Sequence, residues 1–118
     1  GFANSVSPEG VQTAVTSGIY NNWLRTRPGQ DGGYSWKAIT VEPNVRYRIG
    51  YTLSIGIGTV ANFIIGTSQG AHDIHDSGDI FTSGTTNFTS AVSPVYFGLR
   101  VTVAGRMAFW RNIILTEA

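Results

Sequence analysis

The chain has 118 residues, which is enough for one hydrophobic core but not for two, so a single domain over residues 1–118 is expected. Its formal net charge is +1 and only 13% of its residues are charged, which argues against electrostatic capture of nucleic acid. The absence of cysteine excludes disulfides, thiolate metal sites and a cysteine nucleophile. No apolar run approaches the roughly 18 residues of a membrane-spanning helix, so membrane insertion is not expected.

The first 33 residues show little regular pattern, and only residues 11–16 indicate a strand there. Proline and glycines within residues 28–33 predict a loop. A clearer strand signal covers residues 34–41 and ends at residues 42–44, where a proline fixes its φ angle and has no N–H to donate. We therefore expect an irregular N-terminal portion over residues 1–33, followed by regular strands.

The strongest signal in the chain is a strict alternation of apolar and other residues over positions 45–57. The apolar members are Val45, Tyr47, Ile49, Tyr51, Leu53, Ile55 and Ile57. A period of two is typical of a strand with one buried face, whereas a helix would repeat every 3.6 residues or so. The shorter apolar run over residues 62–67 indicates a strand that is buried on both faces or bent.

Three further segments follow. The polar residues 68–79 form a stretch long enough for a contact or functional loop, and the threonine-rich residues 81–90 are expected to be extended. Residues 95–103 alternate again, and residues 104–116 read as a turn and a returning strand, as in a hairpin. The expected core face of the alternating segment is Val95, Phe97, Leu99, Val101 and Val103.

Together these segments predict an all-β protein. Seven or eight short strands separated by regular turn signals are typical of an antiparallel β-sandwich, and no window of the sequence has the periodicity of a helix.

Residues 56–61 match the pattern G-x-G-x-x-A that binds dinucleotides, but that function requires a helix directly after the glycines. The residues that follow read as a strand, so a glycine-rich hairpin turn is the simpler interpretation. No cofactor is expected.

Both histidines lie in a polar segment, residues 72–79, with three of the four aspartates. His72 and His75 could bind a ligand or a metal ion, yet their spacing fits no known metal motif. The alternative is a solvated loop whose aspartates cap turns. No serine lies in a G-x-S-x-G elbow and no carboxylate spacing selects a catalytic pair, so we expect neither a metal site nor an enzyme.

Aromatic and polar residues gather on both sides of the 28–33 loop. They are Tyr20, Trp23, Arg25, Arg27, Asp31, Tyr34 and Trp36. These are the residue types that bind sugars, because a sugar ring lays its C–H face on an aromatic ring while polar side chains bind its hydroxyls. For any single aromatic residue a place in the core is the simpler interpretation, and for the cluster both interpretations stay open.

Four arginines fall on the side opposite the expected core face of the two long alternating strands or just beyond it: Arg46, Arg48, Arg100 and Arg106. If those strands are neighbours, the arginines line one side of a sheet. They would then either keep an exposed face soluble or bind a second subunit or a polyanionic sugar through their guanidinium groups.

Several of these segments resemble the strand pattern of family 4/9-type carbohydrate-binding modules. The resemblance lies in Val41-Glu42-Pro43-Asn44-Val45-Arg46-Tyr47-Arg48-Ile49, in Ile64-Ile65-Gly66-Thr67-Ser68, in Phe88-Thr89 with Val95-Tyr96-Phe97-Gly98-Leu99, and in Ala108-Phe109-Trp110-Arg111-Asn112-Ile113-Ile114-Leu115. Such modules are jelly-roll β-sandwiches, and similar domains are appended to bacteriophage tail fibres and tailspikes. Arg111 stands where the family has an aspartate that often helps to hold calcium, so a structural calcium ion is not implied here.

The resemblance implies a non-catalytic module of a phage tail fibre or tailspike that contacts a host surface glycan and supports oligomerisation, as a homotrimer. It would be made in the bacterial cytoplasm and built into the virion, or otherwise be extracellular. The alternative is a purely structural virion domain, for decoration or fibre trimerisation, with no sugar site. The predicted ligand-binding residues are Trp23, Arg25, Tyr34, Trp36, His72 and His75, and the predicted subunit contacts are Arg46, Arg48 and Arg100.

Overall fold

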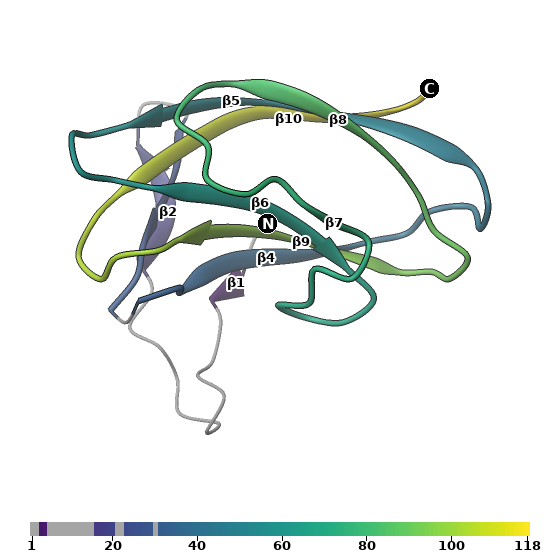
Figure 1. Ribbon diagram of the computed structural model, residues 1–118, viewed down its shortest axis with the longest axis horizontal. Coiled ribbons are helices and arrows are strands. Elements are labelled where there is room, and N and C mark those ends of the chain that lie inside the picture. The colour runs from purple at the N-terminus through teal and green to yellow at the C-terminus, as the bar shows by residue number, and fades with distance from the viewer. Residues whose placement is uncertain (1–2, 5–15, 21–22, 30) are drawn as a thin grey trace.

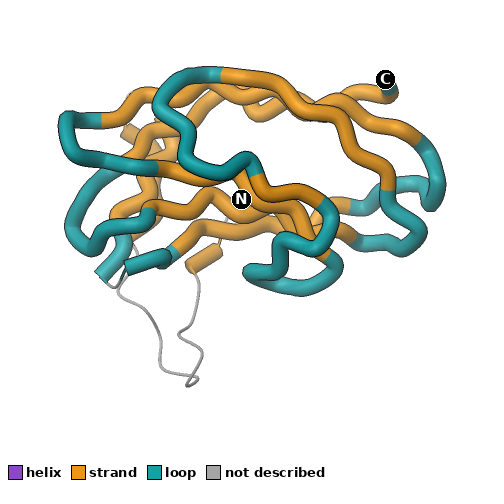
Figure 2. The backbone as a smooth tube through the Cα atoms, viewed as in Figure 1, coloured by secondary structure: helices purple, strands orange, loops and turns teal. Residues whose placement is uncertain are grey.

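The computed structural model describes residues 3–4, 16–20, 23–29 and 31–118, with side chains from residue 26 onward. Within this described part, every regular element is a strand, as Figure 2 shows. No helix long and apolar enough to span a bilayer occurs among these residues. The all-β expectation is confirmed.

The strands form two antiparallel five-stranded sheets (Figure 1). The first, here the β9 sheet, contains in spatial order β1 (Ala3–Asn4), β4 (Tyr34–Ile39), β9 (Val95–Val101), β6 (Ala61–Gly66) and β7 (His75–Asp76). The second, here the β5 sheet, contains β2 (Thr16–Tyr20), β3 (Trp23–Arg27), β10 (Ala108–Glu117), β5 (Arg46–Ile55) and β8 (Gly84–Thr89). Of the ten strands in the described part of the chain, eight are longer than two residues, in agreement with the expected eight or so.

The chain passes from one sheet to the other at almost every connection after β3. β4, β6 and β9 belong to the β9 sheet, while β5, β8 and β10, which follow them in the sequence, belong to the β5 sheet. This crossing pattern makes the sandwich a jelly roll, as the resemblance implied.

Two expected hairpins are therefore wrong. β10 pairs with β3 and β5 rather than with β9, and β6 pairs with β9 rather than with β5. The glycine-rich residues 56–60 form a turn between sheets, in which Thr59 N–H donates to the carbonyl of Gly56 at 3.2 Å and Gly58 has a φ of 79°. Strand β6 follows this turn directly, so the helix that a dinucleotide site needs is absent from the described chain.

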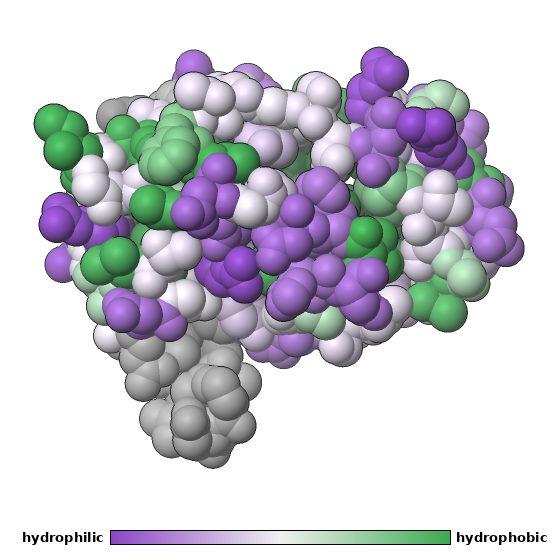
Figure 3. Space-filling model, in the orientation of Figure 1, coloured by the Kyte–Doolittle hydropathy of each residue, from purple (hydrophilic) through white to green (hydrophobic). Residues whose placement is uncertain are grey.

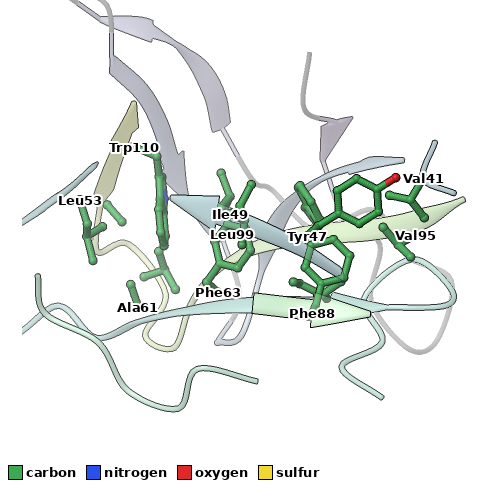
Figure 4. Packing of buried hydrophobic residues seen from close by; sticks show 14 residues of the cluster. Val41, Tyr47, Ile49, Leu53, Ala61, Phe63, Phe88, Val95, Leu99 and Trp110 are labelled. Atoms are coloured by element: carbon green, nitrogen blue, oxygen red, sulfur yellow. The ribbon is translucent and has the colours of Figure 1, made fainter. Parts of the chain in front are cut away.

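The core lies between the sheets and follows the predicted alternation (Figure 4). Ile49 and Leu99 face each other from opposite sheets within the core cluster, and Trp110 is completely buried. Phe63 of the β9 sheet connects the two layers of the core. Its ring centroid lies 5.1 Å from that of Tyr51 in the β5 sheet and 5.6 Å from that of Phe97 in its own sheet. Burying one side of each strand in this way supplies most of the stabilisation of a sandwich.

The alternation predicts two core residues that lie beyond the ends of the strands and are not buried. Ile57 is completely exposed and Val103 is 42% exposed, although both were expected on the core face. β5 ends at residue 55 and β9 at residue 101, and the chain then turns away from the sheets. A periodic pattern can continue past the point where backbone pairing stops.

The N-terminal portion is more regular than expected, because β1, β2 and β3 all lie within residues 1–33. Residues 11–15 of the predicted strand 11–16 lie outside the described residues. β3 joins the β5 sheet, and its buried Thr26 shares a hydrogen bond of 2.9 Å with Ser35 of β4 in the opposite sheet. This pair satisfies two buried hydroxyls across the core.

Two glycines allow close packing on the outer side of the β9 sheet. A Cβ atom on Gly98 would lie only 2.5 Å from Cγ1 of Ile64, which covers that position from β6. A Cβ atom on Gly66 would meet the backbone of Ala71, so the segment after β6 packs directly on the strand end.

We predict that Gly98→Ala lowers the free energy of unfolding by about 1–3 kcal/mol, because the added methyl group must displace the buried Ile64 side chain. Urea denaturation would measure the change. Gly50→Ala in β5 is the matched control, since its Cβ would lie 3.5 Å from Thr85, an ordinary contact. Adding Ile64→Ala to Gly98→Ala should cost less than the two single changes combined, and equal costs for Gly98→Ala and Gly50→Ala would contradict the close packing.

Candidate functional site

The outer face of the β9 sheet carries the densest group of potential ligand-binding residues in the described chain. Because Ser35, Phe97 and Leu99 point into the core, their neighbours along each strand point outward. The outward residues are Tyr34 and Trp36 from β4, Tyr96 and Arg100 from β9, and Asn62 and Ile64 from β6. The pairing places Tyr34, Arg100 and Asn62 in one row and Trp36, Gly98 and Ile64 in the next.

An aromatic platform occupies one side of this face. The rings of Trp36 and Tyr96 pack with centroids 5.8 Å apart, and both side chains are half-buried rather than part of the core. Beside them Gly98 leaves room for Ile64. The Tyr34 hydroxyl contacts Gly70, whose φ of 77° only glycine adopts easily, so the segment after β6 bends back to the edge of the platform.

A polar pocket of about 560 Å³ adjoins the row of Tyr34 and Arg100. Its lining residues are Asp31, Gly32, Asn62, Asp76, Gly78, Asp79, Arg100 and Thr102. The pocket thus combines three carboxylates, one guanidinium and one amide. Figure 3 shows hydrophilic residues gathered over the part of the surface where β7 and its flanking segments lie.

Hydrogen bonds hold the polar groups of the pocket in place. Arg100 Nε donates to Asn62 Oδ1 at 2.8 Å, and its Nη2 lies 3.5 Å from Oδ2 of Asp76. Asn62 is 2% exposed, and its Nδ2 donates to the carbonyls of Ala61 and Gly78 and to Oδ1 of Asp79. Because both ends of the amide are bonded, Asn62 fixes the guanidinium against the sheet.

The aspartates of the 68–79 segment also hold its turns. Asp73 accepts hydrogen bonds from the backbone N–H and the hydroxyl of Thr67, at 2.9 and 2.7 Å, and Asp76 accepts one from the N–H of Gly78. The turn-capping interpretation of this segment is confirmed for these two residues. The hydroxyl hydrogen bond from Thr67 is the main reason that the pKa of Asp73 lies below its ordinary value of 3.8.

The two histidines lie beside the pocket rather than in it. His72 is exposed, with Nδ1 3.6 Å from Oδ2 of Asp76, and His75 is half-buried in β7, where it pairs with Ile65. Among the described residues, no group of three or more histidines and carboxylates is placed to hold a metal ion.

The predicted aromatic cluster is divided between the sheets. Tyr34 and Trp36 lie together on the outer face of the β9 sheet, but Trp23 and Arg25 lie in β3 of the β5 sheet. The structure describes only the backbone of Trp23 and Arg25. The 28–33 loop crosses between the sheets, so residues that are close to it in the sequence diverge. The binding role of all six predicted residues stays a prediction.

The predicted arginine face is also divided. Arg46 and Arg48 belong to β5 and Arg100 to β9, so they lie on opposite outer faces of the sandwich, and the assumption that these strands are neighbours is wrong. Arg106 lies in the turn after β9, where its guanidinium carbon is 3.5 Å from the position of a Cβ on Gly58. A subunit contact by these arginines stays a prediction.

Sequence reasoning missed Asn62 and the partnership of Trp36 with Tyr96. A signal for Asn62 was present, because it is the one polar residue with a side-chain amide in a six-residue strand that is buried throughout. Such a residue needs hydrogen-bond partners, and here those partners build the pocket.

We predict that Asp73→Asn weakens the acid sensitivity of the fold. The pKa of Asp73 is lowered in the folded protein, so its stabilisation is present above pH 4 or so and is lost as the pH falls through the folded-state pKa. Thermal unfolding between acidic and neutral pH should show a small decrease in Tm for the variant at neutral pH and a flatter acid limb. Thr67→Val should act in the same direction, and the exposed Glu42→Gln is the charge-matched control. An unchanged acid limb in both variants would contradict this role.

Comparison with known proteins places the fold. No family model and no curated protein matches the sequence. Among solved structures, a carbohydrate-binding module of family 4 superposes with a TM-score of 0.67 at 9% identity, over 90% of this chain and 78% of that one. The enzymatically active domain of tailspike protein 4 of bacteriophage CBA120 gives a TM-score of 0.59 at 12% identity.

A third similar structure is the Clostridium thermocellum endo-1,4-β-D-xylanase 10B with its CBM22 and GH10 modules and xylohexaose, with a TM-score of 0.56 at 17% identity. This chain is covered completely in the last two cases, but it spans only 19% of the tailspike chain and 26% of the xylanase chain. The shared part is the sandwich itself. The chain therefore has the β-sandwich fold found in carbohydrate-binding modules.

Proposed function

We propose that this chain is a non-catalytic module that binds a glycan on the outer face of the β9 sheet. The observation that carries the proposal is the Trp36–Tyr96 platform next to the fixed Arg100–Asn62–Asp76 network. A sugar needs both parts, because its C–H face packs on an aromatic ring and its hydroxyls need oriented donors and acceptors. The fold similarity to carbohydrate-binding modules supports the same conclusion.

The site favours a neutral glycan. Asp31, Asp76 and Asp79 outnumber the single guanidinium of Arg100 in the pocket, so a sugar carboxylate would be repelled. Sugar hydroxyls can instead donate to these carboxylates and accept from the guanidinium. Since the polar groups are already held by hydrogen bonds, little ordering cost remains for binding.

We further propose that the module belongs to a phage tail fibre or tailspike, where it would contact a glycan of the host surface within a trimeric virion protein. The similarity to a bacteriophage tailspike over the whole of this chain supports this setting. The resemblance of the strand pattern to modules appended to tail fibres supports it as well.

A specific observation favours a second, structural role in assembly. One end of the sandwich exposes apolar side chains from two neighbouring turns, with Ile57 fully exposed, Val103 42% exposed and Met107 37% exposed. Figure 3 shows hydrophobic side chains at the end where the β5–β6 connection lies. A hollow of about 200 Å³ lies between the turns. Exposed apolar groups of this kind are typical of subunit contacts.

We predict that Trp36→Ala weakens glycan binding roughly tenfold or more, because it removes the platform for the sugar ring. Binding would be measured by a glycan array of bacterial surface polysaccharides and neutral oligosaccharides, followed by calorimetry on the best ligand. Phe81→Ala is the matched control, since Phe81 is an exposed aromatic residue that belongs neither to the Trp36–Tyr96 platform nor to the lining of the pocket.

Thermal unfolding shows whether a loss of glycan binding comes from the missing side chain or from unfolding of the variant. Trp36 lies outside the core cluster, so Trp36→Ala should keep nearly the wild-type Tm. Unaltered binding by a folded Trp36→Ala variant would contradict the site, and so would the absence of binding to any neutral glycan by the wild-type chain.

We predict that the wild-type chain forms trimers and that Ile57→Asp shifts it toward monomers that remain folded, because a charge would replace an apolar side chain that is exposed in the single subunit. Sedimentation velocity at micromolar concentration would measure the association. Val92→Asp is the matched control, since Val92 is an exposed apolar residue in the connection from β8 to β9, at the opposite end of β5 from Ile57. A wild-type chain that stays monomeric would contradict an assembly role for this end.

A further inference from the structure

The two outer faces of the sandwich differ in charge. All four aspartates of the sequence lie in connecting segments or at β7 near the β9 sheet, and three of them line its pocket. The outer face of the β5 sheet instead carries Arg46, Arg48 and Arg111, all exposed. A net charge of +1 hides this separation.

Arg46 and Arg48 lie on the same side of β5, two residues apart, which places their Cα atoms about 7 Å from each other. Their cross-strand partners are uncharged: Thr89 and Asn87 on β8, and Thr116 opposite Arg48 on β10. Neither arginine forms an ion pair with any described carboxylate. Both guanidinium groups therefore face solvent, and the nearby carboxylate of β10, Glu117, lies opposite Tyr47, whose side chain points to the other side of β5.

A β-bulge on β10 brings further groups to the same face. The pairing with β5 shifts between Arg111 and Ile114, and Asn112 has a φ of 52°, in the left-handed region that asparagine adopts more readily than most residues. As a result Arg111 and Asn112 are both exposed, and Ile114 is 59% exposed next to Gly50. A bulge re-aims the side chains of its strand and is often found next to functional sites.

We propose that the outer face of the β5 sheet is a second polysaccharide surface, which binds an acidic glycan through its carboxylate or sulfate groups. Guanidinium groups match these anions with paired hydrogen bonds. Asn87 and Asn112 supply amides for hydroxyls, and Ile114 supplies an apolar contact for a sugar ring. The acidic pocket of the opposite face would repel the same polymer, so the two faces select different glycans.

An acidic polysaccharide suits this face better than nucleic acid. The positive charge is limited to a few arginines on a chain of net charge +1. An aromatic side chain described on this face, Phe109 of β10, is half-buried and lies opposite Ser54, six residues along β5 from Arg48, so it is not placed to stack a base beside the arginines. The exposed hydroxyls and amides between the arginines match a polymer in which charged and neutral groups alternate.

The test compares Arg46→Gln/Arg48→Gln with the wild-type chain by calorimetry at low and physiological salt. The probes are polygalacturonate for carboxylate, dextran sulfate for sulfate and unmodified dextran as the neutral control. We expect binding to one or both anionic probes, weakened at least tenfold in the double variant. Lys37→Gln/Arg106→Gln removes the same charge from exposed residues elsewhere and should keep the wild-type affinity.

Several results would overturn the proposal. The first is that dextran binds as strongly as the anionic probes, or that neither anionic probe binds. The second is that the control double variant loses as much affinity as Arg46→Gln/Arg48→Gln. The third is that single-stranded oligothymidylate binds more tightly than the anionic probes and that this binding also depends on Arg46 and Arg48. Loss of self-association in Arg46→Gln/Arg48→Gln, seen by sedimentation, would reassign the face to a subunit contact. Trp36→Ala should leave anionic binding intact, so failure of this surface and failure of the β9-sheet site can be told apart.

Discussion

The burial of one side of every long strand between two sheets is the constraint on which the rest of the structure depends. Phe63, Phe97 and Trp110 fill the interior together with aliphatic side chains from both sheets. Side chains along a strand point alternately to its two sides, so the residues before and after each inward residue point to an outer face of the sandwich. The packing of the core thus decides which residues are available for binding, and it divides them between two faces that cannot bind the same part of a ligand.

The candidate site on the β9 sheet shows how one buried polar residue organises such a face. Asn62 occurs in a strand that is otherwise apolar apart from a glycine, and its amide joins the sheet to the segment after β7 through Gly78 and Asp79. The same amide orients Arg100. An exposed arginine on a strand would sample many rotamers, whereas this one is held at two of its nitrogens, so a ligand meets a surface that is already ordered.

The sequence was sufficient to predict the fold class and the inner faces of the long strands. The alternation over residues 45–57 identifies Tyr47, Ile49 and Leu53 as core residues, because it depends only on local geometry. It does not identify the partner of a strand. Whether β5 lies beside β9 in one sheet or opposite it in the other sheet depends on long-range packing. Because the two strands are in different sheets, Arg48 and Arg100 lie on different outer faces. The same limit applied to the site, since Trp36 and Tyr96 are 60 positions apart and meet only through the pairing of β4 with β9.

The crossing of the chain between sheets after β3 has a consequence for how the protein reaches its native state. Neighbouring strands within a sheet, such as β4 and β9 or β3 and β10, come from opposite halves of the chain. Only the pairings of β2 with β3 and of β6 with β7 join strands that are close in the described sequence. Long loops must close before the other pairings are gained, which makes folding of such topologies slow. Neither half of the polypeptide contains a complete sheet, so the domain acquires its structure as one cooperative unit, and a fragment released before synthesis is finished would expose unpaired strand edges.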